Sequence, residues 1–193
     1  MHDLTDEELT IGFKLLQSIN GENAAREGLA ETPGRYMKAL KGWTAGYAQD
    51  PIAVLKTFDD GAKDSNDIIL LTDIPLYSMC EHHLATIFGV AHIGYIPNGR
   101  IVGLSKMSRV VDIFAKRLQV QERLTNQIAD AIIEGLDAKG VAVVLDCRHM
   151  CMESRGINKP GITTRTTARR GVLTDPEMYR HEFLPQIPRS VTV

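Results

Sequence analysis

The chain has 193 residues, of which 44% are hydrophobic and 24% charged, and this composition is typical of one globular domain with a short extension. A formal net charge of −2 excludes a general attraction to polyanions, so phosphate binding would need a local basic cluster. The acidic start MHDLTDEELT is unlike a signal peptide, no apolar run is long enough to span a membrane, and three cysteines argue against a disulfide framework. We therefore expect a cytoplasmic protein.

Residues 1–63 are expected to form an N-terminal helical segment. Thr5 and Glu8 have the spacing of a capping box at the start of a helix. A second helix is predicted to begin with Thr32 as its N-cap and Pro33 at its first position. Polar, turn-forming residues around position 60 then separate this segment from residues 64–193, which are expected to form a single globular unit.

The pattern changes to strands after this boundary. Residues 67–80 and 84–97 are rich in β-branched and aromatic residues, and Asn98-Gly99 predicts a hairpin leading to a short return strand. The remaining predicted elements are helices at 105–118 and 120–136, strands at 140–152 and 161–173, and a short helical tail at 175–187. This order predicts an α+β fold, in which an antiparallel sheet carries two helices on one face.

The stretch MCEHHL, residues 79–84, concentrates side chains that bind metals or move protons. Cys80 supplies one ligand and a histidine supplies a second, and a cysteine from the later stretch DCRHMC would supply a third. Such a set leaves the fourth position of a tetrahedral site for water, which is typical of catalytic zinc, and thiolate and imidazole ligands favour zinc over magnesium or calcium. Spacing alone does not choose between His82 and His83.

The stretch DCRHMC offers two cysteines to complete this set. On a continuous strand, Cys147, His149 and Cys151 would point to the same face. Spacing alone does not choose between the two cysteines, although a small core residue is the favoured interpretation of Cys147.

Four motifs, CEHH, GLSKMSR, QVQERLT and HMCMESRG, occur in an order and spacing that resembles the GTP cyclohydrolase I family, from about ETPGR to the end of the chain. The resemblance implies the tunnelling fold for a catalytic domain at 64–193. It also implies zinc-dependent hydrolytic opening of the guanine ring of GTP, with release of formate and formation of 7,8-dihydroneopterin triphosphate, the first step of pterin and tetrahydrofolate synthesis.

The resemblance further implies a set of partners and roles. The expected assembly is a homodecamer of two stacked pentamers with active sites between subunits, and neither nucleic acid nor a membrane is an expected partner. The resemblance makes Cys80, His83 and Cys151 the zinc ligands, and makes His82 and His149 active-site histidines that do not bind the metal. Opening of the ring requires a proton on the purine imidazole nitrogen, and the resemblance assigns its delivery to His149.

Substrate binding needs a partner for guanine and positive charge for the triphosphate. Guanine presents its N1–H and 2-amino groups as paired donors, for which a carboxylate is the natural acceptor. Glu122 is the candidate, with Gln121 beside it, although a first-turn acid also favours the helix dipole without any ligand. Ser105 is expected to cap a helix whose N–H groups form an anion site. The resemblance assigns phosphate contacts to Lys106, Arg109, Arg155, Arg35 and Lys38, some of them from neighbouring subunits.

Two other functions remain open from the residues. One is a zinc-stabilised binding module without turnover, in which Cys147 closes a four-ligand site. The other is a different enzyme of the same fold, such as a nitrile reductase of queuosine synthesis, which uses a cysteine nucleophile and no zinc. The paired CEHH and HMC motifs argue against a nitrile reductase.

The last strand adds Arg165 and Arg169 on one face and Arg170 on the other. Either exposed edge charges or contacts with a neighbouring subunit would explain these arginines.

Overall fold

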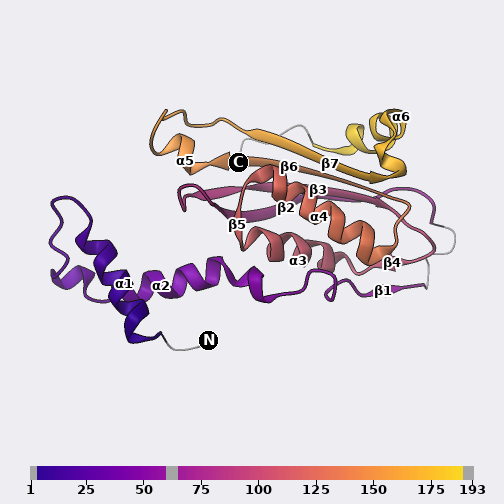
Figure 1. The fold of residues 1–193 in the computed structure, drawn as a ribbon. Helices are drawn as coiled ribbons and strands as arrows, with labels where there is room; N and C mark the ends of the chain where they lie inside the picture. Colours follow the sequence, from indigo (N-terminus) through magenta and orange to yellow (C-terminus); the bar gives the residue numbers. More distant parts are fainter. Residues whose placement is uncertain (1–3, 60–64, 189–193) are drawn as a thin grey trace. The chain divides into compact units, whose positions relative to one another are not determined.

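The computed structural model describes residues 4–59 and 65–188 and contains two compact units, Met1–Ala45 and Gly46–Val193 (Figure 1). The boundary predicted between residues 63 and 64 lies outside the described residues. None of the described helices has the length and apolar character that a membrane span requires.

The first unit consists of two helices and a short turn. Helix α1 (Asp6–Gln17) begins with the predicted capping box, because the Thr5 hydroxyl accepts a hydrogen bond from the Glu8 N–H and the Glu8 carboxylate accepts one from the Thr5 N–H. Turn η1 (Glu27–Leu29) leads to α2 (Thr32–Trp43). The predicted start of α2 is wrong by one residue, since Glu31 is the N-cap. Pro33 is accommodated inside the first turn, where its missing N–H has no intrahelical partner to lose.

A five-stranded sheet with the strand order β5-β2-β3-β6-β7 forms the centre of the second unit. The four long strands pair antiparallel, as predicted, but the short β5 pairs parallel with β2, so the sheet is mixed. The strands are β2 (Ile69–Cys80), β3 (Thr86–Ile96), β5 (Leu118–Gln119), β6 (Gly140–His149) and β7 (Thr164–Gly171). Strand β5 takes its two residues from the end of a predicted helix and from the linker after it.

The return strand predicted after Asn98-Gly99 does not pair with its predecessor. Strand β4 (Ile101–Val102) pairs with β1 (Thr57–Phe58) in a separate two-stranded sheet, which follows η2 (Ala45–Ala48) in the chain. The reason is that both hydrogen-bonding edges of β3 are already taken, one by β2 and the other by β6. The predicted hairpin is therefore wrong, although a turn is present.

The two faces of the sheet bury different elements. Helices α3 (Leu104–Ala115) and α4 (Gln121–Leu136) cover one face, where Val143 and Leu145 of β6 join their core. Val144, which lies between them on the strand, points the other way and packs with Phe183. Phe183 belongs to the C-terminal turns, which lie on that side of the sheet (Figure 1). These turns are η3 (Val172–Thr174), α6 (Pro176–Met178), η4 (Tyr179–Phe183) and η5 (Leu184–Gln186). Two long helices on one face agree with the prediction, and the short tail partly covers the other.

Strand β6 is shorter than the sequence predicts. It ends at His149, and the next residues form the short helix α5 (Met150–Glu153). The ladder stops there because Ile87, the partner of His149, lies next to the first residue of β3. Cys151 therefore lies on a helical turn and not on the same strand face as Cys147, which corrects the predicted alternation.

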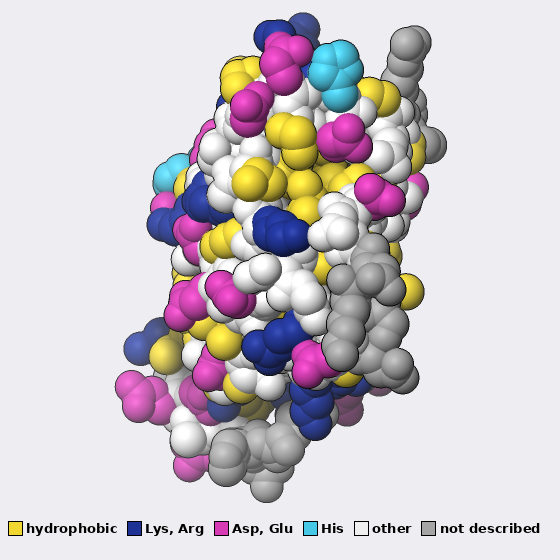
Figure 2. All heavy atoms as spheres, turned by 90° about the vertical axis from the view of Figure 1, so that its right-hand side faces the viewer, with side chains coloured by type: hydrophobic (Ala, Val, Ile, Leu, Met, Phe, Trp, Pro, Cys, Tyr) yellow, Lys and Arg dark blue, Asp and Glu magenta, His cyan; other side chains and the backbone are white. Residues whose placement is uncertain are grey.

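Figure 2 shows the molecule from the right-hand side of Figure 1. Hydrophobic side chains gather in the upper part of this view, and acidic and basic side chains are interspersed around and below them. On this face, the basic side chains that the structure describes do not merge into one extended patch. This distribution agrees with the net charge of −2, which predicts that phosphate binding needs a local basic cluster.

Candidate metal centre and active site

Three side chains from two distant stretches of the chain meet at one end of the sheet. The ligand atoms of Cys80, His83 and Cys151 all lie within 4.8 Å of one another. Cys80 is the last residue of β2, His83 lies in the turn that follows, and Cys151 lies in α5. The turn is closed by a hydrogen bond of 2.9 Å from the Leu84 N–H to the Cys80 carbonyl oxygen. Local structure at each strand end thus presents the donors to a common point.

The geometry and chemistry of this group fit a tetrahedral zinc ion. Zinc–sulfur and zinc–nitrogen bonds of about 2.3 and 2.0 Å place neighbouring ligand atoms about 3.5–3.8 Å apart. The distance between Cys80 Sγ and His83 Nδ1 is 3.8 Å. Burial and the neighbouring Cys80 thiol raise the pKa of Cys151. A bound cation would favour the Cys151 thiolate, which this environment otherwise disfavours.

Cys147 belongs to the core and not to the metal cluster. Its side chain is 1% exposed and packs in the main hydrophobic cluster. Burial, together with the charge of Asp146, raises the pKa of Cys147 to about 12, so its thiol is protonated at neutral pH. Within the described residues, the group of possible ligands contains three side chains and does not include Cys147. This arrangement speaks against a closed four-ligand site and agrees with the predicted core position.

The first histidine of the CEHH motif points toward a carboxylate. His82 is exposed, its Nδ1 lies 4.0 Å from Cys80 Sγ, and its Nε2 lies 3.8 Å from an oxygen of Glu81. The other oxygen of Glu81 accepts a close hydrogen bond from Arg123 on α4. His82 is therefore next to the cluster, and its neighbour Glu81 is oriented by a helix on the covered face of the sheet.

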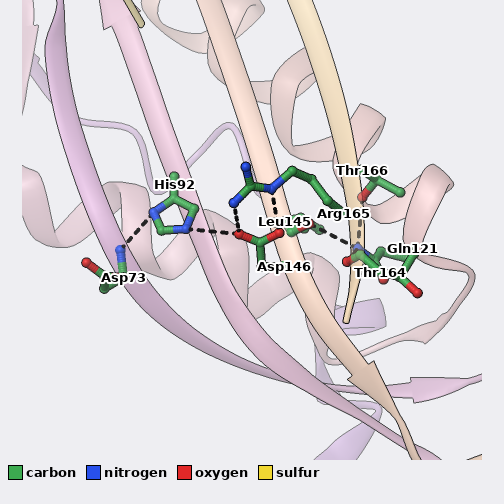
Figure 3. A network of polar contacts seen from close by, with 8 residues as sticks. All are labelled: Asp73, His92, Gln121, Leu145, Asp146, Thr164, Arg165 and Thr166. Atoms are coloured by element: carbon green, nitrogen blue, oxygen red, sulfur yellow. Dashed lines mark hydrogen bonds and ion pairs between the residues drawn. The ribbon is translucent and has the colours of Figure 1, made fainter. Parts of the chain in front are cut away.

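His149 is held by Gln121. Its Nε2 lies 2.7 Å from Gln121 Oε1. The Gln121 amide nitrogen donates to the carbonyl oxygens of Leu145 and Thr164 and to the Thr166 hydroxyl at 2.9–3.1 Å (Figure 3). Because the amide nitrogen faces three acceptors, the amide oxygen must face His149. An amide oxygen only accepts, so Nε2 of His149 carries a hydrogen and Nδ1 is the nitrogen free to exchange a proton.

The environment of His149 favours its neutral form. Burial lowers the pKa of His149, and the carboxylates of Glu122 and Glu153 oppose that effect. Glu122 is exposed in the first turn of α4, next to the buried Gln121. The two residues predicted to bind guanine therefore differ in their surroundings. Glu122 is open to a ligand, whereas the side-chain amide of Gln121 is engaged within the protein.

The predicted phosphate-binding residues lie on three separate segments. Ser105, Lys106 and Arg109 are on α3, but the N-cap of this helix is Gly103, so the predicted capping role of Ser105 is wrong. Arg109 lines a cavity of about 310 Å³ together with Lys116. The other three predicted residues are exposed: Arg155 after α5, and Arg35 and Lys38 on α2 of the first unit. Phosphate contacts of all six residues stay predictions.

A second buried polar network lies on the opposite face of β6. Asp146 accepts two hydrogen bonds from Arg165 at 2.6 and 2.7 Å, and its oxygen lies 3.6 Å from Nε2 of His92 (Figure 3). Nδ1 of His92 accepts a hydrogen bond of 3.2 Å from the Asp73 N–H. Asp73 has a positive φ of 56° at an irregularity in the β2 register, which turns its N–H toward the histidine.

The three arginines of β7 divide between the two faces, as predicted. Arg165 pairs with Asp146, and the Arg169 guanidinium lies 4.9 Å from the Tyr179 ring centroid on the same face. Arg170 reaches Asp130 of α4 on the other face. Each of the three arginines thus has a partner within the chain. From the sequence, both exposed edge charges and contacts with a neighbouring subunit had been open explanations for them.

Sequence reasoning missed the contacts that hold Glu81 and His149. Arg123 was not among the predicted site residues, and Gln121 was predicted to bind substrate. Both lie in the first turn of α4, within the QVQERLT motif, but nothing in their spacing indicates which groups they hold. The signal available for Glu81 and Glu153 was their position beside the metal-binding cysteines, because buried or turn carboxylates need a cationic partner.

An α+β fold with an open three-ligand cluster beside a positioned histidine defines a candidate metal-dependent hydrolase. A family model described as GTP cyclohydrolase I matches residues 12–188. Curated relatives of the chain carry the name GTP cyclohydrolase 1. The relative from Janthinobacterium sp. is 56% identical over 93% of this chain and 90% of its own length. The relative from Nitrosospira multiformis is 54% identical over 94% of this chain and 96% of its own length. The relative from Corynebacterium glutamicum is 52% identical over 89% of this chain and 87% of its own length. The chain belongs to the GTP cyclohydrolase I family.

The family match confirms the resemblance and the predicted fold class, a tunnelling fold with an N-terminal helical segment. Among solved structures, the crystal structure of an archaeosine synthase QueF-like protein in the apo form matches with a TM-score of 0.47 and 17% identity. The match covers 56% of this chain and 97% of that protein.

Proposed function

We propose that this chain carries out the zinc-dependent opening of the guanine ring of GTP, releasing formate and producing 7,8-dihydroneopterin triphosphate for pterin and tetrahydrofolate synthesis. Membership of the GTP cyclohydrolase I family makes the chain a GTP cyclohydrolase, as the motifs predicted. The observation that carries the mechanism is the convergence of Cys80, His83 and Cys151 within 4.8 Å, next to a histidine with a defined hydrogen-bond partner.

Cys80, His83 and Cys151 would hold the zinc ion. When bound by three protein ligands, zinc lowers the pKa of a water molecule to about 7 and thereby provides a hydroxide nucleophile near neutral pH. The protein contributes the ligands, their orientation and a neighbouring proton donor. His149 is the proposed proton-transfer group: its Nδ1, the nitrogen that Gln121 leaves free, would first take up a proton and then deliver it to the purine, and His82 is the second candidate for proton transfer.

Glu122 is the proposed guanine-recognition residue. Its exposed carboxylate lies beside Gln121 at the start of α4, and two carboxylate oxygens suit the N1–H and 2-amino donors of guanine. Adenine lacks this donor pair, so a carboxylate here would select GTP over ATP. The triphosphate is proposed to contact Ser105, Lys106, Arg109 and Arg155, with Arg35 and Lys38, in a site completed by neighbouring subunits.

The proposed assembly is a homodecamer of two stacked pentamers. Large apolar side chains that are exposed in the single chain support contacts with further copies, and Tyr77, Leu104 and Ile157 are 70%, 61% and 62% exposed. Strand β7 is an edge of the sheet and offers backbone groups for a further strand. The predicted cytoplasmic location stays a prediction.

The test is to incubate the full chain with GTP or ATP and to follow formate and the pterin chromophore. We expect formate from GTP but not from ATP, loss of turnover after thorough chelation, and recovery when zinc is added back. His149→Ala should reduce turnover while GTP binding is retained, and Glu122→Ala should weaken GTP binding. Undiminished formate production from a zinc-free sample would contradict the proposed mechanism.

A further inference from the structure

Each of the two segments that carry the metal-binding cysteines also carries a glutamate held by an arginine. Glu81 directly follows Cys80, and Glu153 lies two residues after Cys151 in α5. Glu81 pairs with Arg123, and Glu153 pairs with Arg148. Neither arginine is a candidate metal ligand. The fact that each pairs with a glutamate close to a candidate ligand therefore needs a separate explanation.

Arg123 ties the first segment to α4 and β5. It donates a close hydrogen bond to Glu81 Oε2 through Nη2, and its Nε donates to Gln119 Oε1 at 3.2 Å. Gln119 is 1% exposed, and its carbonyl oxygen accepts the Glu81 N–H at 3.0 Å. Its amide nitrogen donates to the Phe114 carbonyl oxygen and to Gln127. The Glu81 backbone is therefore bound to the buried Gln119, and the Glu81 side chain is bound to Arg123, which itself contacts Gln119.

Arg148 ties the second segment to β6. Its Nε and Nη2 donate to the two oxygens of Glu153 at 2.8 and 2.6 Å, a bidentate geometry that defines both position and orientation. The Glu153 side chain is 6% exposed. The guanidinium also lies 5.2 Å from the centroid of the Phe88 ring on β3.

The two pairs differ in what they contribute to the fold, but they share a geometric effect. Arg123 and Glu81 are 43% and 32% exposed, and pairs in such positions add little to global stability. The Glu153 carboxylate is buried, so that pair matters to the fold as well. In both cases the arginine comes from a long helix or strand, and the glutamate comes from the short turn that presents a ligand.

We propose that Arg123 and Arg148 are positioning residues of the metal site, each orienting one ligand-bearing segment through its glutamate so that the three donors are held together before the metal binds. Groups that orient ligands from outside the first coordination sphere commonly change metal affinity by about 10- to 100-fold. This inference rests on the metal site of the proposed function.

The test compares Arg123→Gln and Arg148→Gln with Arg170→Gln in the zinc-loaded full chain. Arg170 offers a matched control, because it also joins α4 to a strand through an ion pair, with Asp130 at 2.6 Å, and lies on neither ligand-bearing segment. The readouts are the rate of zinc transfer to a chromogenic chelator and the absorption spectrum of the cobalt-substituted protein. Neither readout depends on turnover of GTP.

We expect both test variants to release zinc about 10- to 100-fold faster than the wild type and to shift the cobalt spectrum, whereas Arg170→Gln should match the wild type. Zinc release at the wild-type rate would overturn the proposal for the arginine concerned. Equal acceleration in Arg170→Gln would overturn it for both, because general loosening of the fold would then be the cause.

Two further variants guard against a failure to fold. Arg148→Lys keeps the charge beside Glu153 but loses the bidentate geometry, and Glu81→Gln removes the charge that Arg123 holds. Both should accelerate zinc release, and wild-type rates in these folded variants would contradict the proposal. If the wild-type chain itself binds no zinc, the proposed function fails. If the wild type binds zinc and the variants hold it equally well, only this inference fails.

Discussion

Gln121 Oε1 and His149 Nε2 are 2.7 Å apart, and this hydrogen bond joins the first turn of α4 to the last residue of β6. The amide nitrogen of Gln121 is directed at backbone carbonyl oxygens, so the amide cannot rotate without losing those bonds. The tautomer and the direction of the His149 ring therefore follow from the packing of a helix on a sheet.

Replacing Gln121 with Leu should reduce kcat by about 10- to 100-fold, because a poorly oriented proton donor spends little time in the reactive geometry. The KM for GTP should change less than kcat if the main role of Gln121 is to orient His149. Thr166→Val is the control, since the Gln121 amide retains its two carbonyl acceptors. A rise in KM with unchanged kcat would instead assign Gln121 to substrate binding.

Cys147 should behave as an inert core thiol. With its pKa raised to about 12 and its side chain 1% exposed, Cys147 should resist iodoacetamide in the native protein at pH 8. Cys151 is only half-buried and should react once the metal has been chelated. Peptide mapping by mass spectrometry distinguishes the two sites.

A Cys147→Ala variant should retain its full zinc content and lose about 1 kcal/mol of stability through the small cavity it leaves. Loss of zinc from Cys147→Ala would revive the four-ligand alternative, in which this cysteine closes the metal site. Metal analysis of the purified variant, together with urea unfolding, provides both measurements.

The stability of the fold should depend on pH through His92. Burial lowers the pKa of His92 below its unfolded value of about 6.5; the carboxylates of Asp73 and Asp146 oppose this shift, and Arg165 reinforces it. Below about pH 6.5 the unfolded chain binds more protons at this position than the folded chain does, so the free energy of unfolding should fall as the pH falls. Above that pH the contribution of neutral His92 is fully present.

Urea unfolding at pH 7.5 and pH 5.5 measures this dependence. The loss of stability between the two pH values should be smaller in His92→Gln than in the wild type. His181→Gln is the matched control, because the His181 side chain is 73% exposed. An identical pH dependence in His92→Gln and the wild type would show that other groups control acid sensitivity.

Gly89 is required where β3 approaches β6. It lies opposite Cys147, and a Cβ at this position would come within 2.0 Å of the Asp146 carbonyl oxygen and 2.7 Å of the Cys147 Cα. Backbone atoms in a central strand pair cannot move aside cheaply, so Gly89→Ala should cost about 2–3 kcal/mol.

Gly42→Ala on α2 provides the comparison for Gly89. A Cβ at Gly42, in the last turn of α2, meets nothing within 4 Å, and alanine favours a helix more than glycine does, so this variant should not be destabilised. Chemical denaturation of both variants measures the difference. Wild-type stability in Gly89→Ala would mean that the β3–β6 pairing can separate at this point.

Local sequence patterns were sufficient for the elements whose signals lie within a few residues. The capping box of Thr5 and Glu8, the strands leading into Cys80 and the two long helices were all predictable, because capping, alternation and helical periodicity act over one or two turns. The motifs of the family, whose match to the chain is confirmed, also named the candidate ligands, although residue spacing alone did not choose between Cys147 and Cys151.

Tertiary structure decided how those side chains are combined. Whether β4 pairs with β3 or β1 depends on which strand edges are already occupied, and whether Cys151 lies on a strand depends on where its partner strand begins. The choice of Cys151 over Cys147 as the third group of the cluster, and the use of Gln121 to orient His149, arise from contacts between residues far apart in the chain. Local propensities cannot specify these contacts, because their energy is gained only after the helices have packed on the sheet.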